Sequence, residues 1–596
     1  MSNAPFLIRF RPLLPVFAAA ALLLSQGSSA HAQTPPAPIP SPAMRVSVRL
    51  VLVDALVTDK EGNVVKGLGP QDFSVLEDGK LQNVTNVSFE QPALLAREVR
   101  SQRGALPPNV TTNRPAFRMP SGQVIVVLLD SLNTRTKDQS YARLELLKYL
   151  GTQVQPGQQI AVYTLGNSLR LLQDFTDDPV LLKAAVDGFQ PNVSVQMMLS
   201  DLSARTPRTS GAQPESLHGN QQDMAVPLER MQEFLNEQVN LITDARVGST
   251  LTAFRWIAQS VAGLPGRKNL IWVSGSFPLA TYSRIIKYSA DGGSANDPSY
   301  VRAEHEYEDM IRETSSVLND AQMAVYPVDA RGLIGSLLGG AEETGLSLGG
   351  TLKTGAEYGQ EVQQASSGLQ ETQATMQQFA GDTGGRVFLN RNDLDHAVAL
   401  SMQDGAAYYL LAFSPHSKVD GKFHKIEVKV NRPGVSVRSR RGFYAFPTAD
   451  DPKYAKVRDG EVRMAMQAAA PGATGVIFDA RVQPPAPAAK MKVAVDFLVD
   501  PSTLSAEDAG GGSKRLAIEF HAVAYQQDGK AAGQRDVATK VTLKAADFTT
   551  IQQQGLLYHL ELELPPGLYK LRLGVVDQHS GFIGTADFPL QLNAPK

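Results

Sequence analysis

The strongest constraint on the fold is an almost uninterrupted apolar run from Gln123 to Asp130, with the sequence Gln-Val-Ile-Val-Val-Leu-Leu-Asp. A run of Val, Ile and Leu without alternating polar residues is typical of a parallel strand that is buried on both faces. Similar runs recur at 159–165, 269–274 and 324–329, and segments with helical spacing separate them. Strands that alternate with helices predict an α/β fold with a doubly wound, mostly parallel sheet.

The segments between these strands predict the rest of the domain, which we place at 120–404. The strand at 169–175 is expected to pair with 159–165 as a hairpin. We expect helices at 141–150, 301–318, 372–380 and 393–402, and two helices within 227–264, the second starting near Thr250 after Gly248-Ser249. Polar or Gly-rich segments at 192–226, 280–299 and 333–369 are expected as insertions on the rim of the sheet.

The first residues predict export. Arg9 and Arg11 precede an apolar stretch at 13–24, and the small-x-small signal Ala30-His31-Ala32 follows. This pattern predicts a cleaved signal peptide at 1–32, and therefore a periplasmic or extracellular protein with no integral membrane span after cleavage. A Pro-rich linker follows at 33–44.

Both flanks of the central domain have strand patterns. Segments 45–92 and 405–446 are expected to pair as one β-sandwich, with the α/β domain inserted between them and a polar, Pro-containing connection near 97–120. A linker with a short helix is expected at 447–472. About seven strand candidates predict a second β-sandwich at 473–596.

Composition excludes several classes of function. The chain has 596 residues, no cysteine and a formal net charge of −2. Its length predicts two to four domains. Without cysteine there is no thiolate chemistry, no disulfide and no cysteine metal site. The near-neutral charge gives no argument for a nucleic-acid partner.

The apolar run and the loop after it, Ser131-Leu132-Asn133-Thr134, resemble the first strand and metal loop of von Willebrand factor A-type (VWA) domains. The order of the expected elements agrees with that domain. More specifically, the chain resembles a bacterial VWA-related family that is common in acidobacteria, over about residues 45–444. The segments that carry this resemblance are 51–59, 72–79, 264–272, 326–332, 381–385, 408–411, 414–415 and 441–444.

The resemblance implies a metal-ion-dependent adhesion site at the carboxyl edge of the sheet. VWA domains hold Mg²⁺ or Mn²⁺ through an Asp-x-Ser-x-Ser loop, a later Thr and a later Asp, and a partner's carboxylate completes the ion's shell. Asp130, Thr134 and Thr250 match three of these metal ligands. Leu132 stands in place of the first Ser and Ser274 in place of the later Asp, so one hydroxyl and one carboxylate are lost. We therefore expect a degraded site that binds Mg²⁺ or Mn²⁺ weakly or not at all.

The carboxyl ends of the strands are where ligands bind in open α/β sheets. The predicted ligand- or partner-binding residues are Asp130, Asn133, Thr134, Thr250, Ser274 and Asp329. Asn133 could offer an amide oxygen if the loop shifted. Structural roles are also open: Asp130 and Thr250 could cap helices, and Asp329 could form an ion pair with Arg331.

No enzyme motif emerges from the sequence. The stretch 381–385, Gly-Asp-Thr-Gly-Gly, lacks the lysine of a phosphate-binding loop and is better explained as a turn that ends a helix. We therefore expect a binding protein, with no catalytic residues, that recognises an unknown protein partner or, as second choice, a glycan. Two alternatives stay open: a structural scaffold whose C-terminal β-sandwich carries recognition, and an unrecognised hydrolase.

Overall fold

A computed structural model of the chain describes residues 51–92, 106–118, 122–192, 222–275, 277, 298–332, 355–416, 420–445, 452–468, 470–483, 485 and 490–593. The predicted signal peptide, the Pro-rich linker and most of the three predicted insertions lie outside these residues. In the part of the chain that the structure describes, no helix is both long enough and apolar enough to cross a membrane.

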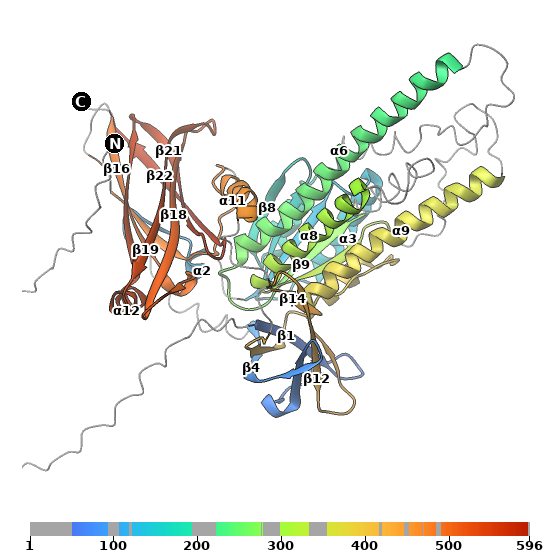
Figure 1. Cartoon of the computed structure of the whole chain (residues 1–596), viewed down its shortest axis with the longest axis horizontal. Helices are drawn as coiled ribbons and strands as arrows, with labels where there is room; N and C mark the ends of the chain where they lie inside the picture. Colours follow the sequence, from blue (N-terminus) through green and yellow to red (C-terminus); the bar gives the residue numbers. More distant parts are fainter. Residues whose placement is uncertain are drawn as a thin grey trace, which may run out of the picture. The chain divides into compact units, whose positions relative to one another are not determined.

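The central sheet has five strands in the order β10-β9-β6-β7-β8. In Figure 1 the sheet lies among the helices labelled α3, α6, α8 and α9. Their bounds are β6 Gln123–Asp130, β7 Gln158–Leu165, β8 Leu169–Thr176, β9 Lys268–Ser274 and β10 Met323–Asp329. The first four in spatial order are parallel, and β8 pairs antiparallel with β7 as the predicted hairpin. Phe388 adds one parallel bridge to Val328 at the edge of the sheet. The predicted doubly wound, mostly parallel sheet is therefore confirmed.

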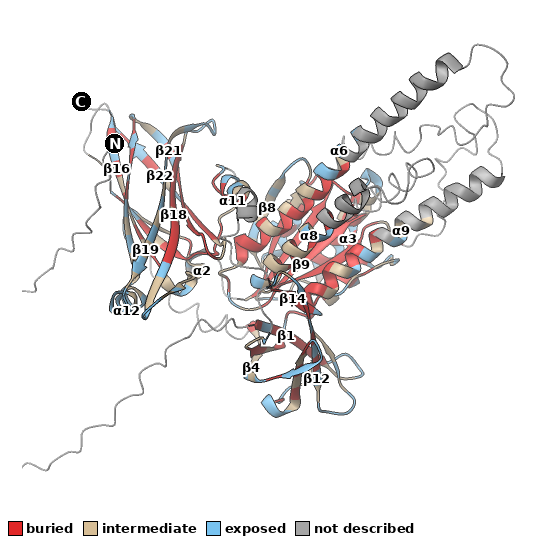
Figure 2. Ribbon diagram, viewed as in Figure 1, coloured by how far each residue is buried: buried red, intermediate tan, exposed pale blue. Residues whose placement is uncertain are grey.

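Helices cover both faces of this sheet, and Figure 2 shows it as a buried layer. One face packs against α6 (Gln222–Val261), α8 (Pro298–Asp320) and α9 (Gly355–Thr383). The other packs against α3 (Thr136–Thr152), α4 (Pro179–Asp187) and α10 (Leu394–Gln403). Every residue of β6, β9 and β10 is buried, which is why their sequences lack polar alternation.

Two predicted helix boundaries are wrong. Most of the segment 227–264 belongs to one 40-residue helix, α6 (Gln222–Val261), instead of two, because the helix continues through Gly248. A single helical glycine costs about 1 kcal/mol, and the burial of Val247 and Leu251 on either side outweighs it. The helix expected at 372–380 is the last part of α9, which begins at Gly355 and ends at Thr383.

The glycines after α9 form the predicted helix-ending turn. Gly384 has a φ of +76°, a conformation that side chains disfavour. The amide of Gly385 donates to the carbonyl of Ala380 at 2.8 Å. A Cβ on Gly385 would lie 1.9 Å from the carbonyl oxygen of Val325 on β10, so only glycine fits there. The turn thus serves packing between helix and sheet.

The two segments that flank the central domain share two four-stranded sheets. Their orders are β13-β1-β11-β4 and β14-β12-β2-β3. The bounds are β1 Val51–Thr58, β2 Phe73–Glu77, β3 Lys80–Gln82, β4 Val84–Glu90, β11 Tyr408–Phe413, β12 Phe423–Val430, β13 Ser436–Arg438 and β14 Gly442–Tyr444. Val53 pairs with Leu411 and Val75 with Val428, more than 350 positions away in sequence. Both sheets bury their inner side chains in one shared core.

Two further sheets share the core of a C-terminal unit. One has the order β20-β16-β15-β5, and the other β17-β18-β21-β22 with β19 paired to β18. The bounds are β15 Phe478–Gln483, β16 Met491–Val499, β17 Glu507–Gly510, β18 Ser513–Tyr525, β19 Ala531–Leu543, α12 Ala545–Gln554, β20 Leu556–Leu564, β21 Gly567–Asp577 and β22 Ile583–Leu592. β16, β18 and β21 are among the strands that the sequence pattern of 473–596 predicts.

One edge of this unit comes from a distant part of the chain. The connection expected near 97–120 contains β5 (Val110–Thr112), followed by the one-turn helix α2 (Pro115–Arg118), and β5 pairs with β15. Asn113, the residue directly after β5, is fully buried. Its amide donates to the carbonyls of Ala473 and Val476 at 3.0 and 2.7 Å and accepts from the amide of Phe478 at 2.9 Å. The C-terminal unit is therefore completed by a segment that precedes the central domain.

Replacing Asn113 by alanine should lower the free energy of unfolding of the C-terminal unit by about 2–3 kcal/mol, because three buried backbone groups lose their partner. Urea unfolding followed by hydrogen exchange in β15 measures this change. Thr111→Ala is the matched control, since its hydroxyl makes one exposed hydrogen bond to Asp587. Equal stability of the two variants would contradict a special role for Asn113.

The segment expected as a linker at 447–472 contains α11 (Pro452–Ala465), which is packed against the C-terminal unit. The guanidinium of Arg572, which is fully buried, donates to the carbonyls of Ala465 and Pro471 at 2.7 Å each. It also forms an ion pair with Asp587. The segment still connects two units, but Arg572 and a small apolar cluster hold it in place.

Candidate functional site

The predicted site residues meet at the carboxyl edge of the central sheet. Asp130 is the last residue of β6 and Ser274 the last residue of β9, and these two strands are neighbours. Thr250 reaches the same place from α6, and Asn133 from the loop after β6. All four side chains are at most 2% exposed, so they form an internal polar network at this edge.

Both oxygens of the Asp130 carboxylate are engaged. Oδ2 accepts hydrogen bonds from Asn133 Nδ2 at 2.9 Å, Ser274 Oγ at 2.9 Å and Trp272 Nε1 at 3.0 Å. Oδ1 accepts from the backbone amide of Asn133 at 3.0 Å. Burial raises the pKa of Asp130 above its usual range, and these hydrogen bonds offset part of that effect. The alternative role of Asp130 as a helix cap is wrong, because α3 begins at Thr136 and has Arg135 at its N-cap position.

The side-chain amide of Asn133 lies between Asp130 and α6. Besides its bond to Asp130, Nδ2 donates to Thr250 Oγ1 at 2.8 Å. Oδ1 accepts from the guanidinium Nε of Arg246 at 3.2 Å. Arg246 is 2% exposed and lies one turn before Thr250, whose hydroxyl donates to the Arg246 carbonyl at 2.9 Å. Thr250 is therefore inside a helix, and its predicted role as an N-terminal cap is wrong.

The other residues of the loop have separate roles. Thr134 Oγ1 accepts from the backbone amide of Gly275 at 2.9 Å and so ties the loop to the end of β9. Leu132, which stands in place of the family's first Ser, is 1% exposed and belongs to the apolar core under α6. The loop thus directs an apolar side chain inward at the position where a VWA metal loop has a hydroxyl.

Asp329 is not part of this network. It is the last residue of β10, and its carboxylate makes two hydrogen bonds of 2.8 Å with the guanidinium of Arg331. The alternative prediction of an ion pair that fixes the loop is therefore confirmed for Asp329. The structure brings together Asp130, Asn133, Thr250 and Ser274, with Thr134 alongside.

These residues do not fit a divalent cation as they stand. Such an ion needs several oxygen lone pairs that converge on one point. Here an NH₂ group, a hydrogen-bond donor, lies between the oxygens of Asp130 and Thr250, and the Thr134 oxygen accepts from Gly275. Within the described ranges, no group of three or more His, Asp or Glu side chains is placed to hold a metal ion.

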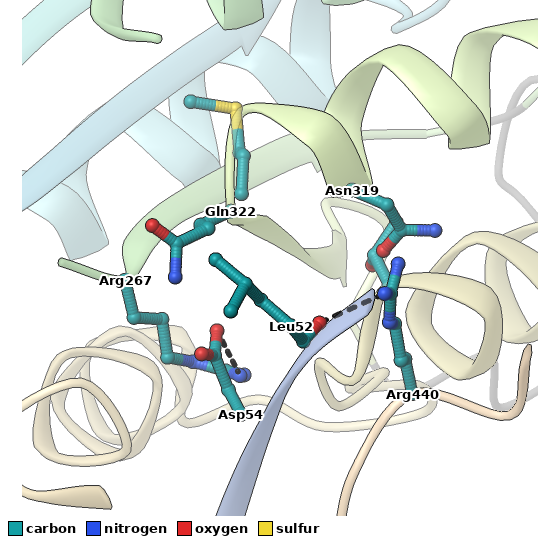
Figure 3. A pocket seen from close by; sticks show the side chains of 8 residues that line it. Leu52, Asp54, Arg267, Asn319, Gln322 and Arg440 are labelled. Carbon is teal, nitrogen blue, oxygen red and sulfur yellow. Dashed lines mark hydrogen bonds and ion pairs between the residues drawn. The ribbon is translucent and has the colours of Figure 1, made fainter. Parts of the chain in front are cut away.

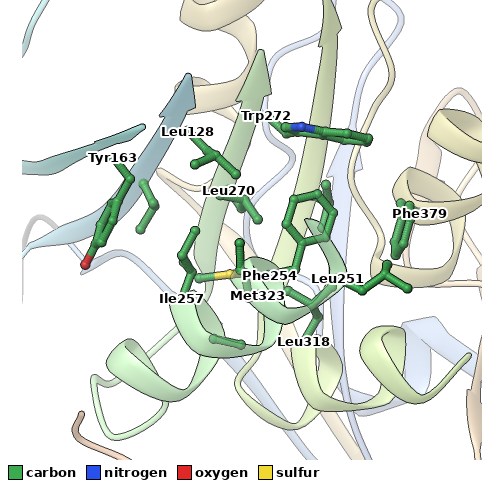
Figure 4. Packing of buried hydrophobic residues seen from close by; sticks show 14 of the residues in the cluster. Leu128, Tyr163, Leu251, Phe254, Ile257, Leu270, Trp272, Leu318, Met323 and Phe379 are labelled. Atoms are coloured by element: carbon green, nitrogen blue, oxygen red, sulfur yellow. The ribbon is translucent and has the colours of Figure 1, made fainter. Parts of the chain in front are cut away.

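Sequence reasoning missed two members of the network, Arg246 and Trp272. Trp272 was expected only as part of an apolar strand, yet its indole N–H donates to Asp130 while its rings pack in the core (Figure 4). Arg246 had one usable signal, its position four residues before Thr250, which places both on the same face of a helix.

A second polar cluster lies at the opposite, amino edge of the sheet, around a small cavity (Figure 3). Arg267 is 4% exposed and donates to Tyr326 Oη at 3.1 Å and to the Gly384 carbonyl at 2.7 Å. It also forms an ion pair of 3.4 Å with Asp54 of β1. Arg440 donates to the Leu52 carbonyl at 2.8 Å. Charged groups thus join the central sheet to the flanking sheets.

Comparison with known proteins adds little to this description. No protein-family model matches the chain, and no curated protein sequence matches it. Among solved structures, it is similar to an aerotolerance-related membrane protein from Bacteroides fragilis carrying multiple mutations to serine, with 10% identity, a TM-score of 0.22, and coverage of 47% of this chain and 99% of that one. It is also similar to a von Willebrand factor type A protein from Catenulispora acidiphila, with 10% identity, a TM-score of 0.20, and coverage of 86% and 75%.

A third similar structure is proximal thread matrix protein 1 from the mussel byssus with a zinc-occupied metal site, with 10% identity, a TM-score of 0.20, and coverage of 50% of this chain and 48% of that one. At such identities and TM-scores these matches carry no functional argument. The class of the protein rests on its own strand order and helix placement, which define a doubly wound α/β fold with one antiparallel edge strand.

Proposed function

We propose that this chain is an exported protein that binds another protein at the carboxyl edge of its central sheet, and that it is not an enzyme. The observation that carries the proposal is the convergence of Asp130, Asn133, Thr250 and Ser274 at that edge, where open α/β sheets bind their ligands. We interpret the two pairs of flanking sheets as β-sandwich domains that support the central one.

The buried hydrogen-bond network fixes the shape of the carboxyl edge. Because the network itself is buried, exposed residues around it would contact the partner. Lys137 in the first turn of α3 and Asn167 in the β7–β8 hairpin are both exposed. Their position follows from the backbone bond of Leu132 to Leu165 at the end of β7, which holds the site loop against that hairpin. These two residues mark the surface that the proposal assigns to the partner.

The proposal is tested with the mature chain, residues 33–596, as bait for envelope and extracellular proteins of the source organism. The edge variant Lys137→Glu/Asn167→Arg should reduce the amount of the retained partner at least about 10-fold, since charge reversal inside an interface is strongly unfavourable. The control Lys492→Glu/Gln552→Arg makes the same charge changes at exposed positions of the C-terminal unit and should leave retention unchanged.

Loss of retention in the control alone would instead favour the scaffold alternative, in which the C-terminal unit carries recognition. Surface variants are preferable to deletion of 474–596, because that deletion would also leave β5 and Asn113 without their partners.

A further inference from the structure

We propose that Asn133 and Arg246 together replace the divalent cation of a VWA metal site, so that this edge of the sheet is organised by a built-in cation. The inference concerns the chain's own residues and does not depend on which partner binds. It explains why the sequence keeps three of the metal-ligand types and yet lacks two.

The Asn133 amide nitrogen contacts two of the retained ligand types. It lies 2.9 Å from Asp130 Oδ2 and 2.8 Å from Thr250 Oγ1. These are the carboxylate and the later threonine that would hold an ion in a site of the VWA type. Ligand oxygens lie about 2.0–2.1 Å from Mg²⁺. The amide nitrogen already fills one contact position on each of these oxygens, so an ion placed between them would have to displace it.

The Asn133 amide cannot turn to present its oxygen to Asp130. Arg246 Nε–H donates to Asn133 Oδ1 at 3.2 Å. If the amide were rotated by 180°, its NH₂ would face the N–H of Arg246, and its oxygen would face the Asp130 carboxylate. Both contacts would be repulsive, so Arg246 fixes the donor side of Asn133 toward Asp130.

Arg246 also supplies the positive charge that a metal ion would bring. A guanidinium is permanently protonated, and Arg246 brings its positive charge to a position that is 2% exposed. The Asn133 amide connects that charge to the Asp130 carboxylate through two hydrogen bonds in series, each of which polarises the next. A fixed cation and its relay thus stand where a metal ion would otherwise balance Asp130.

The two departures from the metal motif agree with this arrangement. Ser274 donates its hydroxyl hydrogen to Asp130, whereas an aspartate at that position would place a second carboxylate beside the first. Leu132 packs in the core and leaves no hydroxyl that could ligate.

The test is calorimetric titration of Mn²⁺ into the chelator-stripped chain 33–596. Its variants distinguish two reasons for the lack of metal binding: the loss of ligands and the occupation of the site by the Asn133 amide. Wild type should show no binding heat. Leu132→Ser/Ser274→Asp restores the ligands but keeps Asn133 and Arg246, and should also show none. The variant that adds Asn133→Ala and Arg246→Ala to these two should bind Mn²⁺ at least about 10-fold more tightly than any other.

Mn²⁺ binding by wild type that disappears in Asp130→Ala would overturn the proposal. Equal Mn²⁺ binding by the two-residue and four-residue variants would do the same, since the amide would then be no obstacle. A single variant covers the case in which the four-residue variant does not fold. Asn133→Ala should lower the melting temperature by about 5 °C or more, because it removes the partners of three buried groups. An unchanged melting temperature would contradict the proposed role.

Discussion

Replacing Trp272 by alanine should lower the free energy of unfolding of the central domain by about 4 kcal/mol, within the range for large aromatic-to-alanine changes in cores. The indole meets Phe254, Phe277 and Phe379 edge to face, with ring centroids 4.9 to 6.3 Å apart. It is buried, and Figure 4 shows it with Phe254 and Phe379. Alanine would leave a cavity in the middle of this cluster and remove one donor to Asp130. Hydrogen exchange in β6 and β9 over a urea series measures the loss for this domain alone.

The matched control is Trp272→Phe, which keeps an aromatic ring in the cluster but removes the indole N–H. It should cost about half as much as alanine, since most of the packing survives and Asp130 keeps three of its four donors. If the two variants were equally destabilised, the hydrogen bond to Asp130 would dominate over the packing. If Trp272→Ala cost less than about 1 kcal/mol, the aromatic cluster would not be a central part of the core.

The double role of Trp272 shows what the sequence could and could not predict. Burial on both faces of a central strand requires a continuous apolar run, so 123–130 and 269–274 were recognisable without any other information. In such a run, however, the role of a single polar group cannot be recognised from the sequence. An indole N–H in an apolar run looks like core, and only the neighbouring Asp130 makes it part of a site.

The predicted elements differ from the structure where contacts between distant parts of the chain override the local conformational preference. Gly248 predicted a helix boundary, but the packing of α6 on both sides of it keeps the helix whole. β5 has three residues, Val-Thr-Thr, and its partner strand β15 lies more than 360 positions later. No local pattern marks such a pairing, so the connection near 97–120 could not be recognised as part of the C-terminal unit.

The candidate site was predictable as a place and not as an arrangement. Asp130 and Ser274 could be placed together because ligands of open α/β sheets bind at the carboxyl ends of the strands. Thr250 could be added only through the resemblance to VWA domains. The direction of the Asn133 amide depends on Arg246, which enters from a helix more than 110 positions away. The orientation of this amide decides whether the site presents an oxygen or N–H groups to a ligand. The sequence does not give this orientation, because it depends on the three-dimensional hydrogen-bond network.

The amino edge of the sheet supports a second strong prediction, on the pH dependence of stability. Lys268, the first residue of β9, is 1% exposed. Burial lowers the pKa of its ammonium group to about 7, and the nearby Asp54 carboxylate offsets only part of that effect. In the unfolded chain the group has its ordinary pKa of 10.5. Between these two values the unfolded chain binds a proton that the folded protein has released.

The sign of the effect follows from that difference in bound protons. Stability should rise with pH between about 7 and 10.5, by up to about 1.4 kcal/mol for each pH unit. Below pH 7 both states are protonated, so the full cost of burying the charge remains and does not change further. Lys268→Met removes the charge and keeps a side chain of similar length, and should be more stable than wild type at pH 7 by on the order of 3 kcal/mol.

The measurement is the urea midpoint of wild type and Lys268→Met at pH 7, 8 and 9, with Lys492→Met as the control at an exposed lysine of the C-terminal unit. The difference between Lys268→Met and wild type should shrink as the pH rises, because wild type loses its buried charge over this range. Titration of other groups is common to all three proteins and cancels in the comparison. A Lys268→Met variant that is less stable than wild type at every pH would mean that the ammonium group is a net favourable partner of Asp54, and that the charged cluster at the amino edge stabilises the junction.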